Sequence, residues 1–191
     1  MSHGGAPSPT VARTMPSGPA PAPRPFVRWF GGVTLALLPQ PALTTGLAGG
    51  ARRGRWRAEL AGLATQQRQA TNGDRPTAGG DFRLWAAGGR ACWDAATTLR
   101  LTPRLCGGVE IERVTASGFG VAAPGQGGAT IGAGTAAGVL AWPITARVEL
   151  ALDLGMAARP YHPTFRLGNV GDVFAVPAWS GAAALSVGIT L

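Results

Sequence analysis

The chain has 191 residues, enough for one domain with a real core or for one small barrel with a tail. Charged residues make up only 14% of it, against about 25% in a typical soluble domain, whereas glycine (30 residues) and proline (16 residues) are abundant. Glycine is a poor helix former, and the apolar residues do not form leucine-rich stripes, so this composition disfavours a soluble helical protein.

The net charge is +8, and arginine supplies all of the basic residues. A strongly basic chain can be a nucleic-acid binder. Here the arginines are scattered along apparent strands, and only Arg52, Arg53, Arg55 and Arg57 form a dense group, around Gly54 in a predicted tight turn. We interpret the arginine content as the codon bias of a GC-rich genome and expect no nucleic-acid partner.

The N-terminal segment, residues 1–25, consists mainly of Pro, Ala, Gly, Ser and Thr. Such a segment cannot bury enough apolar surface to offset its chain entropy, so we expect a disordered Pro/Ala-rich tail or linker. The folded domain is then residues 26–191. The tail lacks the apolar centre of a secretory signal, and we expect the export signal to belong to a longer parent chain or a different start.

Residues 29–51 carry no charge and invite two interpretations. A hydropathy window would assign a transmembrane helix or an uncleaved signal anchor, since about 20 apolar residues span a bilayer. Against this, Pro39 and Pro41 lie near the middle, and proline inside a helix removes a hydrogen bond and kinks the chain. We therefore predict two strands with the turn at residues 38–41.

The clearest periodicity in the chain has a period of two residues and covers residues 146–159. Its even positions are all apolar, and its odd positions hold charges and small residues. Side chains alternate across a strand, so this segment is a two-faced strand, and it is long enough for the about 9–11 residues that cross a membrane at a tilt. Residues 183–191 repeat the pattern.

Weaker alternation marks further strands, and the total is eight. These strands cover residues 27–37, 43–52, 56–64, 85–94, 104–112 and 129–141. The connections at 53–55, 94–103 and 142–144 are expected to be short, and those at 66–81, 117–128 and 160–178 long. Only the turn near Pro39 breaks this alternation.

An even number of strands with short turns at one rim and long loops at the other is typical of outer-membrane barrels. Over residues 26–191 the chain resembles the OmpA/OmpX-type eight-stranded barrels, although it ends in Leu191 where that class has an aromatic residue. The resemblance implies a closed, antiparallel, up-and-down all-β barrel in the bacterial outer membrane. It also implies outer-membrane lipid as a partner, a monomer, and a structural or surface-interaction role with a plugged lumen.

The two strand faces predict what lies inside. Near-balanced charges suit the narrow interior of an eight-stranded barrel, where unpaired charges would be very costly. We expect a lumen charge network of Arg57, Glu59, Arg90, Asp94, Arg104, Glu110, Glu112, Arg147, Glu149 and Asp153. The same faces also carry Arg28, Arg52 and Arg159.

The apolar face carries Trp29, Trp56, Trp85, Trp93 and Trp179, mostly near strand ends, where membrane interfaces select tryptophan. The alternatives are a soluble sandwich with tryptophan core anchors, or a secreted soluble barrel that binds an apolar ligand. The secreted barrel would place leucines 150, 152 and 154 inside.

Cys92 and Cys106 are the only cysteines. A hairpin centred near Leu99 puts them opposite each other, with Cβ atoms about 4.5–5.5 Å apart. We predict a disulfide, which an oxidising periplasm permits; two buried free thiols are the alternative. Two thiols without nearby histidine do not make a zinc site, so we expect no metal and no cofactor.

Two residues raise the alternative of a lipid-modifying barrel enzyme. His162 lies in the last long connection, and Ser180 follows it in the chain. No spacing of acid, base and nucleophile is evident, so we assign no catalytic residue and expect no enzyme.

Arg83 and Arg113 interrupt the apolar face. The hairpin register that pairs the cysteines brings these arginines together on the outer surface, toward the rim with the long loops. Arginine suits bidentate recognition of phosphate. We hypothesise that the pair contacts lipopolysaccharide phosphates; two rim arginines in water are the alternative.

Overall fold

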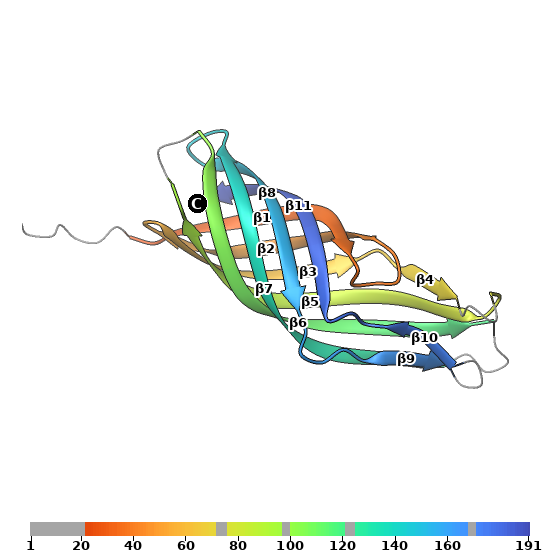
Figure 1. Cartoon of the computed structure of the whole chain (residues 1–191). Coiled ribbons are helices and arrows are strands. Elements are labelled where there is room, and N and C mark those ends of the chain that lie inside the picture. The colour runs from red at the N-terminus through yellow and green to blue at the C-terminus, as the bar shows by residue number, and fades with distance from the viewer. Residues whose placement is uncertain (1–21, 72–75, 97–99, 121–124, 168–170) are drawn as a thin grey trace, which may run out of the picture.

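The computed structural model describes residues 22–71, 76–96, 100–120, 125–167 and 171–191. Within these ranges every regular element is a strand (Figure 1). The strands are β1 (Arg24–Leu35), β2 (Ala42–Arg53), β3 (Trp56–Thr65), β4 (Arg68–Thr71), β5 (Gly79–Asp94), β6 (Thr102–Phe119), β7 (Gln126–Pro143), β8 (Val148–Ala158), β9 (Thr164–Leu167), β10 (Gly171–Ala175) and β11 (Trp179–Thr190). The predicted tail falls mostly on residues 1–21, outside the described residues, and β1 starts just before the predicted boundary at residue 26.

The sheet closes on itself. Antiparallel neighbours follow the order β3-β2-β1-β11-β8-β7-β6-β5, and β3 pairs with β5 to complete the circle. The short β4 continues along β5 beyond the end of β3, and β9 and β10 form a separate hairpin. The prediction of a closed, antiparallel barrel of eight strands is confirmed, and closure removes the open edges that the barrel strands would otherwise present.

The uncharged stretch at residues 29–51 forms the β1–β2 hairpin, as the two prolines predict. No helix in the described part of the chain is long and apolar enough to cross a membrane. The next turn, between β2 and β3, contains Gly54 at φ +61°, a left-handed conformation that glycine adopts without steric cost.

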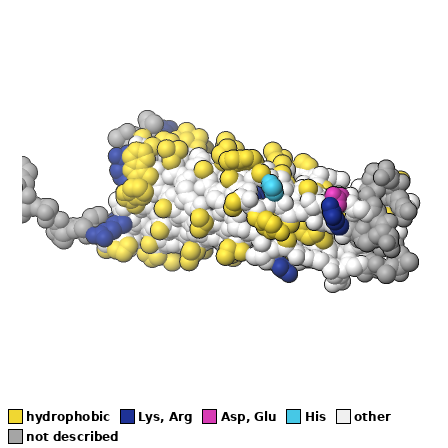
Figure 2. All heavy atoms as spheres, turned by 60° about the horizontal axis from the view of Figure 1, so that its bottom comes forward, with side chains coloured by type: hydrophobic (Ala, Val, Ile, Leu, Met, Phe, Trp, Pro, Cys, Tyr) yellow, Lys and Arg dark blue, Asp and Glu magenta, His cyan; other side chains and the backbone are white. Residues whose placement is uncertain are grey.

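The apolar face of the barrel points outward. Leu150, Leu152 and Leu154 are 40%, 38% and 56% exposed, and large apolar side chains from the other barrel strands are exposed as well. Figure 2 shows hydrophobic side chains spread over the length of the barrel exterior. The alternative of a soluble carrier with these leucines inside is therefore wrong, because its ligand-binding interior would need the opposite facing.

The two ends of the barrel differ. Both ends of the described chain meet at one of them, where the Leu191 amide donates to the Pro25 carbonyl at 2.9 Å. The β2–β3, β5–β6 and β7–β8 connections lie at this end, which we call the termini rim (Figure 1). The opposite end, which carries the β1–β2 connection and the β9–β10 hairpin, is the loop rim.

Two of the three connections predicted to be long contain additional strands, and the third includes the ends of two barrel strands. Residues 66–81 include β4, and residues 160–178 include the β9–β10 hairpin. In the segment 117–128, residues 117–119 are the end of β6 and residues 126–128 the start of β7, and each of these strands is 18 residues long. This segment is rich in glycine and other small residues and has no regular apolar alternation, so the strand ends in it leave no period-two pattern. In Figure 1, β5, β6 and β7 extend well past the other barrel strands at the loop rim.

Apolar side chains fill the interior at the loop rim. Phe82 of β5 is buried, and its ring contacts Phe165 and Phe174 of the β9–β10 hairpin edge-on, with centroids 5.4 and 5.3 Å apart. The cluster around it is Leu37, Leu38, Ala42, Leu84, Ala86, Val114, Ile131 and Val176. The β9–β10 hairpin and the β1–β2 connection thus cover this end of the lumen with apolar surface.

The predicted disulfide is present. Cys92 of β5 and Cys106 of β6 are directly opposed in the ladder, with Cα atoms 4.0 Å apart, and their sulfurs are bonded. Both side chains are buried and pack against Val139, Ala141 and Ala151. The prediction is confirmed because the β5–β6 register is the one that the cysteine spacing requires.

Replacing both cysteines, Cys92→Ala with Cys106→Ala, should lower the free energy of unfolding by about 3 kcal/mol, because the cross-link restricts a loop of about 15 residues in the unfolded chain. Urea unfolding in lipid vesicles measures the difference. Reduced wild type is the matched control and should unfold like the double variant. Equal stability of the oxidised and reduced wild type would contradict the prediction.

Candidate functional site

The lumen contains most of the described acidic side chains of the protein, each near arginines. Its side chains come from alternate positions of the strands, and β3, β5, β6 and β8 each contribute two or more charges an even number of residues apart along one face. The lumen arginines are Arg28, Arg57, Arg90, Arg104 and Arg159, and the acids are Glu59, Asp94, Glu110, Glu112, Glu149 and Asp153.

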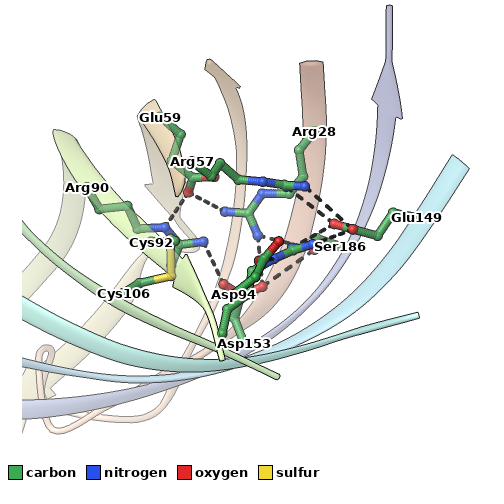
Figure 3. Close-up of a disulfide and its surroundings, with 11 residues drawn as sticks. Arg28, Arg57, Glu59, Arg90, Cys92, Asp94, Cys106, Glu149, Asp153 and Ser186 are labelled. Atoms are coloured by element: carbon green, nitrogen blue, oxygen red, sulfur yellow. Dashed lines mark hydrogen bonds and ion pairs between the residues drawn. A yellow bond between two sulfur atoms is a disulfide. The ribbon is translucent and has the colours of Figure 1, made fainter. Parts of the chain in front are cut away.

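The central layer is a closed ring of alternating charge. Arg28 of β1 donates to Glu59 of β3 at 2.7 Å and to Asp153 of β8 at 2.8 Å. Arg90 of β5 contacts the same two carboxylates, with 2.7 Å to Asp153. Ser186 of β11 also accepts from Arg28 at 3.2 Å. Figure 3 shows these side chains pointing toward one another across the lumen, so the ring ties together strands far apart in the sequence.

A second layer lies nearer the termini rim. Arg104 of β6 binds Asp94 of β5 at 2.6 Å and Glu149 of β8 at 2.8 Å. Arg57 of β3 reaches the same Glu149 at 3.3 Å, and Arg52 of β2 pairs with Asp94 at 2.9 Å. Each carboxylate is therefore shared by two arginines, which keeps the buried charges compensated.

A third, smaller layer lies between the central ring and the apolar cluster. Arg159, directly after β8, forms two hydrogen bonds to the Glu112 carboxylate, at 2.6 and 2.5 Å. Both side chains are 0% exposed. Arg159 also donates to the Ser180 hydroxyl at 2.9 Å, so the Ser180 side chain is occupied within the lumen.

Small residues on the neighbouring strands make room for these side chains. Gly108 of β6 is directly opposite Arg90, and a Cβ at Gly108 would come within 2.3 Å of the Gly89 carbonyl oxygen. Gly88 is opposite Glu110 in the same ladder. A cavity of about 180 Å³ remains beside the central ring, lined by the charged side chains of Arg28, Glu59, Arg90, Glu110 and Asp153, by the apolar side chains of Phe30, Leu63, Val109 and Met156, and by small residues.

Nine of the ten predicted network residues face the lumen, and Arg147 does not. Arg147 is exposed in the β7–β8 connection, because the turn bonds from Ile144 and Thr145 to the Val148 carbonyl delay the start of β8. Glu110 is half-buried in the wall of the cavity, two residues before Glu112. The network also includes Arg28, Arg52 and Arg159, which the alternation in the sequence places on the same polar faces of the strands.

Arg83 of β5 and Arg113 of β6 are exposed on the outer face near the loop rim. They are diagonal neighbours, because Arg83 pairs with Thr115 and Arg113 with Trp85. Arg113 donates to the Thr130 hydroxyl at 2.9 Å. Both line a surface hollow together with Asp81, Gln67, Ser117 and Gln126. The register thus brings the two arginines together, as predicted.

The described residues contain no group of three His, Cys, Asp or Glu side chains that could hold a metal ion. His162 is exposed, whereas Ser180 is buried and bound to Arg159.

Closed strands, an outward apolar face and a charged lumen define a transmembrane β-barrel of the outer-membrane type. No family model matches the chain, and no curated protein matches it. Among solved structures, the chain is similar to a major outer membrane protein from Thermus thermophilus, with TM-score 0.68 and 11% identity over 89% of this chain and 100% of that one.

Two other solved structures share this fold. Neisserial surface protein A has TM-score 0.62 and 14% identity over 91% of this chain and 100% of its own. Ail of Yersinia pestis, crystallised with the heparin analogue sucrose octasulfate, has TM-score 0.53 and 11% identity over 88% of this chain and 97% of its own. These similarities define the fold, and together with the outward apolar face they support localisation in the bacterial outer membrane.

The variant Glu112→Gln should lower the free energy of unfolding by about 3–5 kcal/mol, because it removes the carboxylate that accepts two hydrogen bonds from the buried Arg159 guanidinium. Replacing both partners, Glu112→Met with Arg159→Met, should cost much less, since no unpaired charge remains. Urea unfolding of the two variants in vesicles gives the comparison.

The exposed pair between Arg166 and Asp172 is the control, and Asp172→Asn should cost about 0–1 kcal/mol because water screens the charges. A Glu112→Gln variant no less stable than Asp172→Asn would refute the account of the buried pair.

Proposed function

We propose that this chain is an outer-membrane barrel with a plugged lumen and a structural or surface-interaction role, and that it is not an enzyme. The observation that carries the proposal is the closed ring of Arg28, Glu59, Arg90 and Asp153 across the lumen. A barrel of eight strands has an interior just wide enough to be filled by side chains. Ion pairs that cross it leave little space for a solute.

Two further barriers lie in series with this ring. The Glu112–Arg159 pair is fully buried above it, and the apolar cluster around Phe82 follows at the loop rim. An ion that entered from either end would have to displace paired charges and then cross apolar surface, at a high cost in desolvation. We therefore propose that the lumen stabilises the barrel and does not conduct.

The surface for interactions is then the loop rim. The extended ends of β5, β6 and β7, with β4 and the β9–β10 hairpin, lie beyond the apolar band at the end where outer-membrane barrels carry their longer loops. Ail, a protein of the same fold, has been crystallised with a polyanionic heparin analogue. We propose that this end meets molecules outside the cell, and that the protein acts as a monomer.

Planar-bilayer recordings test the plugged lumen. The refolded protein should first migrate faster before boiling than after it, as a closed, detergent-resistant barrel does. In the bilayer it should then give no steady ion conductance, with a general porin as the positive control. A persistent open channel in most insertions would overturn the plugged lumen, whereas identical mobility before and after boiling would overturn the membrane barrel itself.

Lipopolysaccharide is the partner we propose for Arg83 and Arg113. Both guanidinium groups are exposed beside Trp85, which is 53% exposed and pairs with Arg113 in the ladder. Tryptophan on the outer face of a barrel favours the membrane interface, so the arginines lie at the height of lipid phosphates. The hollow that they line also contains hydroxyl and amide groups that suit a sugar phosphate.

The variant Arg83→Ala with Arg113→Ala should bind lipopolysaccharide about tenfold more weakly or worse, because each arginine supplies a charge-assisted hydrogen bond. Titration of the refolded protein with purified lipopolysaccharide measures the affinity. Arg53→Ala with Arg147→Ala, which removes the same charge at the termini rim, should lose less affinity for lipopolysaccharide than the Arg83/Arg113 variant, because only the loop-rim pair lies in the hollow that fits a sugar phosphate. If both double variants bind like wild type, the two arginines do not contact the ligand.

A further inference from the structure

The positive charge of the protein is unevenly distributed. The chain has a net charge of +8, yet the lumen contains as many acids as its ion pairs need. Outside the lumen the described acids are Asp81 and Asp172, and both lie toward the loop rim. Among the described residues, the only acids near the arginines of the termini rim are Asp94 and Glu149, and both are already paired inside the lumen.

The arginines of the termini rim come from several strands and turns around its circumference. They are Arg24, Arg52, Arg53, Arg55, Arg100 and Arg147. Figure 2 shows dark blue side chains at the left end of the molecule, which is the termini rim. Such a ring of like charges repels itself, and it is stabilised when an anion comes between its members.

Two of these arginines have partners within the barrel. Arg52 pairs with Asp94 at 2.9 Å. Arg55 donates to the Asp94 carbonyl at 2.9 Å and stacks on the Trp93 ring, with its guanidinium carbon 4.6 Å from the ring centroid. The other four are exposed and form no ion pair with any described residue. They are free to bind an external anion.

The free arginines lie at the edge of the outward apolar band. Arg53 is directly opposite Trp56 in the β2–β3 ladder, and Trp56 is 62% exposed. Near Arg147, Trp142 is 54% exposed on β7 and Ile144 is exposed in the β7–β8 connection. Tryptophan on a barrel exterior marks the level where acyl chains meet headgroups. Guanidinium groups beside it are at the level of the phosphates.

We propose that the termini rim binds the phosphate groups of anionic phospholipids, such as phosphatidylglycerol, in the leaflet at that end. The inference rests on the proposed membrane barrel. It adds a lipid preference at the end opposite the loop rim, where lipopolysaccharide is the proposed partner. Arginine binds phosphate with a planar, bidentate fork, and each cationic group near an anionic surface adds attraction. The adjoining apolar band favours a lipid over a soluble polyanion, because the same surface also binds the acyl chains.

Tryptophan fluorescence quenching by brominated lipids tests this. The reporter background Trp85→Phe with Trp179→Phe removes two exposed tryptophans toward the loop rim, so that the signal comes mainly from the termini side. In vesicles at low salt, brominated phosphatidylglycerol should bind at least about threefold more tightly than brominated phosphatidylcholine. Arg53→Gln with Arg100→Gln and Arg147→Gln should bring the ratio close to one.

Two controls separate charge at this rim from charge elsewhere. Lysine at the same three positions should keep most of the preference, since the charge remains. Arg83→Gln with Arg113→Gln and Arg166→Gln removes equal charge near the loop rim and should keep the ratio well above that of the termini-rim variant. Unboiled mobility of each variant verifies that the barrel has folded, so loss of folding is distinguishable from loss of lipid preference.

An equal affinity for both lipids in the reporter protein would overturn the proposal. An unchanged ratio of the two lipid affinities in the variant with glutamine at positions 53, 100 and 147 would also overturn it. If the protein showed no lipid preference but bound soluble heparin, and the three glutamine substitutions at the termini rim weakened that binding, the ligand of the rim would be a soluble polyanion instead.

Discussion

The backbone hydrogen bonding between β3 and β5 is the constraint on which the rest of the structure depends. In a bilayer no water can satisfy free amide and carbonyl groups, so a sheet is stable there only when its two edge strands pair. Closure with eight strands also fixes the diameter. A narrow cylinder has one small interior and one large exterior, and the facing of every side chain follows from these two environments.

The narrow interior explains why the lumen charges come in shared pairs. A carboxylate such as Asp94 is 1% exposed and would be very unfavourable alone, yet it lies between Arg52 and Arg104. Replacing such layers with apolar residues could give a barrel of similar stability. Their use here is to fill the cylinder with side chains whose pairing is specific, since each arginine of the network reaches at least one acid on a strand that is not its neighbour. The lumen thereby links opposite walls of the barrel.

Much of this could be predicted from period-two alternation, because barrel strands face lipid on one side and the lumen on the other. The hairpin register followed from one covalent constraint, the Cys92–Cys106 spacing, and that register also aligned Asp94 with Arg104 and brought Arg83 near Arg113. The ring was beyond prediction, since Arg28 and Asp153 meet across the lumen and no local register connects β1 with β8. The ends of β6 and β7 were missed because the strand there leaves the membrane and its faces no longer differ.

The distribution of charge along the barrel axis follows from the same geometry. The lumen is nearly neutral, because unpaired charge there is costly, and the apolar band excludes charge from the outer wall. The surplus arginine can therefore lie only at the two rims, next to the headgroups of the two leaflets. At the loop rim Asp81 lies beside Arg83 in the surface hollow, whereas at the termini rim Asp94 and Glu149 are drawn into the lumen and leave the outer arginines uncompensated. The pairing that fills the lumen thus makes the termini rim the more basic end, and a basic rim beside an apolar band is suited to anionic lipid.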